Sequence, residues 1–147
     1  MSRFTAVRDL VVARLSTISG YSVKTIAAAH AAEARPSTYP GYTVAMDEIE
    51  RLTSQDYANA GQLKRTYRVP LFVQVFGKSY DVTLTGAELA VDVLDGQTPN
   101  AGMPSNTTRT HLVCGNIGER LVETGLVVMV VPVSCDLTWA VTVTFQG

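Results

Sequence analysis

The stretch from Glu123 to Gln146 constrains the fold more than any other part of the sequence. From Leu126 to Val133 every residue except Pro132 is apolar, and from Leu137 to Phe145 large apolar residues alternate strictly with Thr and Ala. Such alternation is typical of a β-strand that buries one face and leaves the other wet or covered by a partner. The Ser-Cys-Asp sequence at 134–136 separates the two runs and predicts a turn, so we expect a terminal hydrophobic hairpin.

Two other segments have the periodicity of an amphipathic helix. Between Ser2 and Ser19 the apolar residues form one continuous stripe, and Gly20 is expected to end this helix. Thr85 and Glu88 fit a capping box, in which each side chain accepts a hydrogen bond from the backbone N–H of the other residue. This spacing predicts a second helix over Gly86–Leu94.

The longest internal strand is predicted at Leu63–Gly77, where Val, Leu and Phe recur with a period of two. Pro70 has no N–H for a strand ladder, so it predicts an edge position or a bulge there. Shorter strands are expected at Tyr21–Ala29, Tyr42–Met46, His111–Cys114 and Arg120–Glu123, although the Ala-rich end of the first is equally compatible with a helix. The polar segments Asp47–Gly61 and Gln97–Thr110 predict long loops.

The order of these segments is a helix, three strands, a second helix, two short strands and the terminal hairpin. A length of 147 residues fits one domain. We therefore expect a single α+β domain over residues 1–147, with a mostly antiparallel β-sheet flanked by two α-helices on one face and with long polar loops.

Charge and composition narrow the function classes. A net charge of −1 argues against a sequence-specific nucleic-acid binder, whose affinity needs a clustered positive field. With 17% charged residues much of the surface is neutral, which is common in proteins covered by other subunits and also occurs in monomers. No apolar run is long enough to span a bilayer, and no signal peptide is expected at the N-terminus. Cys114 and Cys135 lack metal-ligand spacing, and we expect small buried thiols rather than a disulfide.

The residues that could carry chemistry do not form a recognisable catalytic or metal motif. His30 and His111 have no second ligand or nucleophile indicated near them, and we interpret them as surface or structural residues. The segment Gly115–Gly118 lacks the spacing of a phosphate-binding loop and predicts a turn. We therefore predict no enzyme activity, no metal and no cofactor.

Two charged clusters remain as candidate contact sites. Asp47, Glu48 and Glu50 are interpreted as a solvated acidic loop or as one side of a salt bridge between subunits. The basic cluster contains Lys64, Arg65 and Arg68, with Tyr67 between them. Its cations could guard a strand edge against stray pairing, bind a phosphate backbone, or pair with Asp47 or Glu48 across a subunit boundary.

Taken together, the segments resemble the tail terminator (tail-completion) proteins of long-tailed bacteriophages. The resemblance covers most of the chain and is carried by FTAVRDLVVARLSTISG, YPGYTVAMDEIE, QLKRTYRVPLFVQVFG, TGAELAVDVLDG and GLVVMVVPVSCDLTWAVTVTFQ. The long segment Gln97–Thr110 departs from the family pattern.

The resemblance implies a structural virion protein with an α+β fold that forms a hexameric ring. Such a ring caps the completed tail tube, at the head-proximal end of a virion assembled in the host cytoplasm, and presents a docking face to the head or neck. The implied partners are copies of the same chain, tail tube and sheath proteins, and neck or connector proteins, with DNA passing through the ring. Candidate interface residues are Asp47, Glu48, Glu50, Lys64, Arg65, Arg68, Thr138, Thr142 and Thr144.

Two alternatives remain open. A neck or head–tail connector (stopper) protein would share the class and differ in its partner. A small α+β ligand-binding or enzymatic domain belongs to another class and would need a pocket between helices and sheet with convergent polar groups.

Overall fold

The computed structural model describes residues 2–31, 33–52, 56–59 and 61–142, and these form an α+β fold. The helices are α1 (Arg3–Leu15) and α2 (Tyr80–Leu94), with a short 3-10 turn η1 (Ala28–His30). The strands described are β1 (Ser22–Ala27), β2 (Gly41–Met46), β3 (Glu50–Arg51), β4 (Asp56–Asn59), β5 (Gln62–Gly77), β6 (Thr107–Arg109), β7 (Val113–Cys114), β8 (Gly118–Glu123) and β9 (Leu126–Thr142). The predicted fold class is confirmed.

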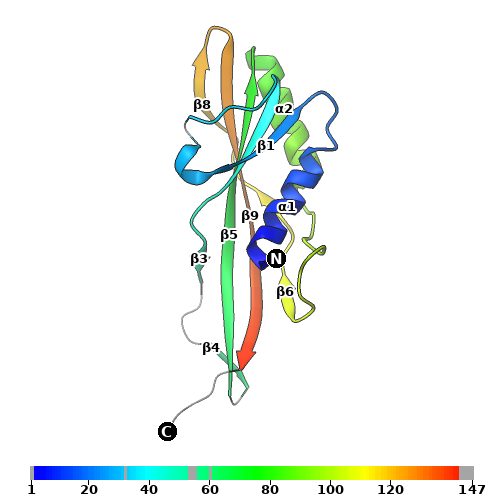
Figure 1. Ribbon diagram of the computed structural model, residues 1–147, viewed down its shortest axis with the longest axis vertical. Coiled ribbons are helices and arrows are strands. Elements are labelled where there is room, and N and C mark those ends of the chain that lie inside the picture. Colours follow the sequence, from blue (N-terminus) through cyan, green and yellow to red (C-terminus); the bar gives the residue numbers. More distant parts are fainter. Residues whose placement is uncertain (1, 32, 53–55, 60, 143–147) are drawn as a thin grey trace.

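Two long antiparallel strands, β5 and β9, form the centre of the sheet and run along the long axis of the molecule (Figure 1). All 16 residues of β5 face residues of β9, from Gln62 opposite Thr142 to Gly77 opposite Val127. The other side of β5 carries β2, β3 and β4 in turn, and the other side of β9 carries β8, β7 and β6. Strand β1 pairs in parallel with β2 and ends the sheet on that side.

The predicted turn at residues 134–136 is wrong, because β9 continues through it. Ser134, Cys135 and Asp136 face Pro70, Val69 and Arg68 in an unbroken register. Burial keeps alternating along this segment, and the pairing with β5 outweighs the turn preference of Ser134 and Asp136. The hairpin lies earlier instead, where β8 and β9 are joined by two residues, 124–125, the second a glycine with φ of +82°.

Both helices cover one face of the sheet, as the sequence predicts. The buried stripe of α1 and the buried small residues of α2 pack against alternate residues of the two long strands. The contributors are Val7, Val11 and Leu15 from α1, Ala87, Ala90 and Leu94 from α2, Val69, Leu71, Val73 and Val75 from β5, and Val127, Met129, Val131, Val133, Cys135, Leu137 and Trp139 from β9. We call this side of the sheet the helix face and the opposite side the outer face.

Helix α2 begins earlier than the capping-box pattern predicts. Ser79 is the N-cap, and its Oγ accepts a hydrogen bond from the N–H of Val82 at 3.3 Å. Thr85 therefore lies within the helix. The next residue, Gly86, allows close packing, because a Cβ there would lie 2.7 Å from Cγ1 of Val75. The hydroxyl of the buried Tyr42 donates to the Gly86 carbonyl at 2.6 Å and ties β2 to the helix.

Helix α1 is shorter than predicted. It starts at Arg3, after Ser2, whose Oγ accepts from the N–H of Thr5, and it ends at Leu15. Gly20, with φ of +84°, lies in the loop that leads into β1. Neither described helix is long and apolar enough to cross a bilayer.

The region 47–61, predicted as a loop, contains β3 and β4. Met46 faces Leu71 whereas Glu50 faces Arg68, so four steps along one side match three along β5. The extra residue on the β2–β3 side forms a bulge opposite Pro70, which confirms the irregularity predicted there. The Pro70 carbonyl accepts a hydrogen bond from the N–H of Asp47 at 2.9 Å, and Pro70 has no N–H to donate in return. The second predicted loop, 97–110, likewise contains β6, and the strand predicted at 111–114 is limited to β7.

Truncating the core under α1 tests the assignment of the helix face. Leu137 is 0% exposed, so Leu137→Ala should lower the free energy of unfolding by about 2–5 kcal/mol in urea titrations at one fixed protein concentration. The matched control Leu84→Ala removes the same atoms from a side chain that is 41% exposed and should change it by less than about 0.5 kcal/mol. Equal losses in the two variants would contradict this assignment.

Candidate functional site

The register of β5 and β9 gathers several of the predicted interface residues on the outer face. Lys64 and Arg68 lie opposite Ala140 and Asp136, and Thr142 lies opposite Gln62. Between them Thr66 faces Thr138, and their hydroxyl oxygens are 3.0 Å apart. This lower part of the two-stranded ribbon thus presents a polar surface away from the helices. Thr144, together with Val143 and Phe145, lies outside the described residues.

Arg68 is held by a carboxylate of its own chain. Its Nε donates to Oδ1 of Asp136 at 3.0 Å, and its Nη2 donates to Oδ2 at 3.4 Å. Glu50 of β3 faces Arg68 from the other side. The hydrogen bond to Asp136 raises the pKa of the Arg68 guanidinium, with further contributions from the charges of Asp136 and Glu50.

Arg65 does not share a surface with Lys64 and Arg68, because neighbouring residues of a strand point to opposite faces. It faces Trp139 across the ladder, on the helix face. There Tyr67 stacks on Trp139 with ring centroids 5.4 Å apart, and Phe4 of α1 contacts both rings. The Nε of Arg65 is buried without a hydrogen-bond partner among the described residues. The basic cluster of the sequence is therefore split in two.

The acidic residues Asp47, Glu48 and Glu50 are exposed and border a cavity of about 640 Å³. The cavity lies where the chain passes from β2 to β3, and Ile49, Arg51 and Pro70 complete its lining. The structure thus places the acidic cluster at the bulge between β2 and β3, opposite Pro70 of β5.

A second cavity, of about 380 Å³, lies on the upper outer face beneath η1 and was not expected from the sequence. Apolar atoms dominate its lining, which comprises Ala28, Ala29, Ala31, Phe72, Gln74, Arg120 and Val130. The side chain of Gln74 is 3% exposed; it donates to the Ala31 carbonyl at 3.1 Å and accepts a hydrogen bond from Arg120. Burial, followed by the charge of Arg35, lowers the pKa of Arg120. The sequence signal that could have indicated this cavity is Gln74, a polar residue within an apolar strand.

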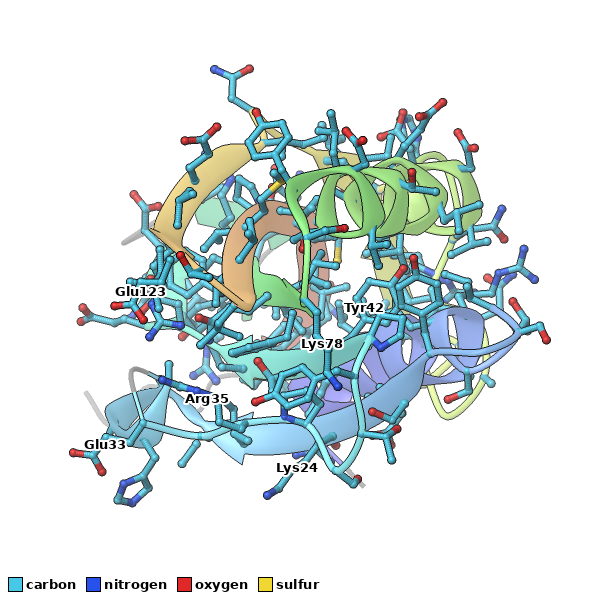
Figure 2. All side chains as sticks on the ribbon, turned by 90° about the horizontal axis from the view of Figure 1, so that it is seen from above. Lys24, Glu33, Arg35, Tyr42, Lys78 and Glu123 are labelled. Atoms are coloured by element: carbon cyan, nitrogen blue, oxygen red, sulfur yellow. The ribbon has the colours of Figure 1, made fainter. Side chains whose placement is uncertain are left out.

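The two ends of the sheet are open in the part of the chain that the structure describes. Strand β1 pairs only with β2, and β8 pairs only with β9. Most residues of β8 are exposed, and Val122 is 54% exposed. Viewed from above, the sheet curves from β8 to β1, with Glu123 at one end and Lys24 at the other (Figure 2).

The remaining titratable groups are dispersed. His30 and His111 are both exposed, at the end of η1 and before β7, and the described residues contain no group of three His, Cys, Asp or Glu side chains suited to a metal ion. Both cysteines are free thiols, with Cys135 buried and Cys114 half-buried. Burial is the main cause that raises the pKa of Cys114 to about 11 and that of Cys135 to about 12.

Comparisons with known proteins give a limited likeness. No protein-family profile and no curated protein matches the sequence. Among solved structures, the chain is similar to one described as "Virion of native gene transfer agent (GTA) particle", over 92% of this chain and 93% of that chain. The TM-score is 0.49 and the sequence identity is 14%, which is too weak to establish a shared fold or function.

A double-mutant cycle tests whether Arg68 forms its ion pair with Asp136 of the same chain in solution. Arg68→Gln and Asp136→Asn should each lower the free energy of unfolding slightly, and the double variant should lose less than the sum of the two. Because both groups are partly exposed, this coupling should shrink as salt is raised. Additive losses in urea titrations at low salt would show that the pair is not formed in solution.

Proposed function

We propose that this chain is a structural subunit of a bacteriophage-type virion. Six copies of the chain close into a ring that caps the finished tail tube and offers a docking face to the neck. The observation that carries this proposal is the pair of open sheet edges, because one edge on each side of the same subunit permits a head-to-tail contact that repeats around a closed ring.

The surface of the molecule supports the same proposal. The two helices cover only the helix face, and the lower outer face is a ladder of Thr, Lys and Arg side chains on the long ribbon. This ribbon continues past the helices (Figure 1), so in a ring it would reach a partner that lies beyond the subunit body. The resemblance of five sequence segments to tail terminators is our reason for proposing the tail tube as that partner.

The neck connector is the second candidate of this class. It would use the same ring and differ only in what the ring binds. The acidic cavity at the bulge and the polar ribbon, which adjoin each other where Glu50 faces Arg68, would be the surface that such a partner binds.

The oligomeric state and the binding partner test this proposal. Sedimentation at rising protein concentration should show a species of about 95 kDa, six times the 15.8 kDa of one chain. Tail tubes assembled without a terminator should retain this species on pelleting, with bound protein at one end of each tube in negative-stain images. Retention by isolated necks alone would favour the connector. A monomer at every concentration that ignores both would refute the proposal.

A further inference from the structure

The two open edges have opposite strand directions and overlap in height. Strand β1 runs parallel to β2, and each remaining step across β2, β5, β9 and β8 is antiparallel, so β1 and β8 run in opposite directions. Through β2 and β5, strand β1 lies level with residues 128–133 of β9, and β8 lies level with residues 126–130. Copies standing side by side in a ring would therefore meet as an antiparallel pair.

We infer that β1 of one copy pairs antiparallel with β8 of the next, with Lys24 opposite Glu123, and that this pairing is the joint of the ring. The inference rests on the proposed function, because it specifies the contact by which that ring closes. The partner is a second copy of this chain.

Charge selects this register, in which neighbouring copies are offset along the strands by four residues, because Lys24 lies level with Val130 of β9 and Glu123 lies level with Leu126. Lys24 and Glu123 are both exposed, and within the described residues neither side chain makes an ion pair. Both lie on the outer face, because Lys24 pairs with Thr43 and Glu123 pairs with Leu126, on the side away from the helices. Opposite charges directly across a strand pair stabilise it, so these two residues favour facing each other.

The neighbouring residues fit the same register. With Lys24 opposite Glu123, Ile26 meets Leu121 on the outer face and Thr25 meets Val122 on the helix face. These assignments agree with the partners inside each copy, since Ile26 faces Ala45, Leu121 faces Val128, and Val122 faces Val127 of the core. The exposed Val122 side chain would then be covered by the adjacent strand.

Backbone polarity also fits. The N–H of Ser22 donates to Pro40, toward β2, so the alternation of a strand turns the N–H and C=O of Thr25 outward. On β8, the two-residue turn closes on Glu123 and Leu126, which leaves the N–H and C=O of Val122 outward. Thr25 and Val122 are therefore free to exchange two hydrogen bonds.

The charge of Lys24 disfavours a two-fold dimer through β1. An antiparallel pair of two β1 strands centred on Lys24 would place the two Lys24 side chains opposite each other, and like charges directly opposite are destabilising. Pairing of β1 with β8 places Lys24 opposite Glu123 instead, and this contact can repeat around a ring.

Charge reversal tests the joint. Lys24→Glu or Glu123→Lys alone should raise the concentration at which the ring assembles by about tenfold. The double variant Lys24→Glu/Glu123→Lys should restore it, because the pair is re-formed with its charges exchanged. Lys78→Glu, at an exposed lysine of the same end, is the matched control and should leave assembly unchanged. Equal effects of Lys24→Glu and Lys78→Glu, or no rescue, would overturn the proposed joint.

A cysteine pair gives an independent readout. Lys24→Cys/Glu123→Cys should form disulfides between copies on mild oxidation and give a ladder of covalent oligomers up to the ring, whereas Lys24→Cys/Glu88→Cys should not extend beyond dimers. The wild-type chain, with Cys114 and Cys135, supplies the background. A ring that forms normally without the ladder or the charge rescue would overturn the joint and leave the proposed function standing. A strict monomer would overturn both.

Discussion

The antiparallel pairing of β5 with β9 is the interaction on which the rest of the structure depends. Its register, from Gln62 opposite Thr142 to Gly77 opposite Val127, fixes which residues point to each face over the whole length of the molecule. All other strands are short, and all of them except β1 pair directly with β5 or β9. A slip of one residue would exchange the buried set, with Leu137 and Met129, for the polar set, with Thr138 and Asp136.

This register divides the molecule into surfaces with different roles. The helix face is closed by α1 and α2, and the small buried residues of α2 allow its close approach to the strands. The outer face is apolar near η1 and polar along the lower ribbon, where Thr66 and Arg68 bond Thr138 and Asp136. The sheet ends on β1 and β8, which leaves backbone groups for a neighbour. Assembly through these edges would need no change in the subunit core.

Periodicity in the sequence was sufficient to predict the class of fold, the long strand β5 and the face that the helices cover. It failed where a local pattern competed with long-range pairing. Residues 134–136 have the composition of a turn, yet they lie within a ladder of sixteen residue pairs between β5 and β9 that keeps them extended. The capping pattern at Thr85 is likewise not used, because Ser79 is the N-cap of α2. Strands β3 and β4 exist only through pairing with β5, which no local pattern reveals. Alternation alone could have separated Arg65 from Lys64 and Arg68.

Hydrogen exchange at the two sheet edges tests the central claim most directly. The account holds that an otherwise complete subunit uses β1 and β8 to join its copies, so the amides of Thr25 and Val122 should become protected together as the protein concentration rises through the assembly transition. Amides in the middle of β5, such as that of Val73, should remain protected at every concentration. Assembly into rings with both edges still exchanging as fast as in the dilute protein would contradict the account.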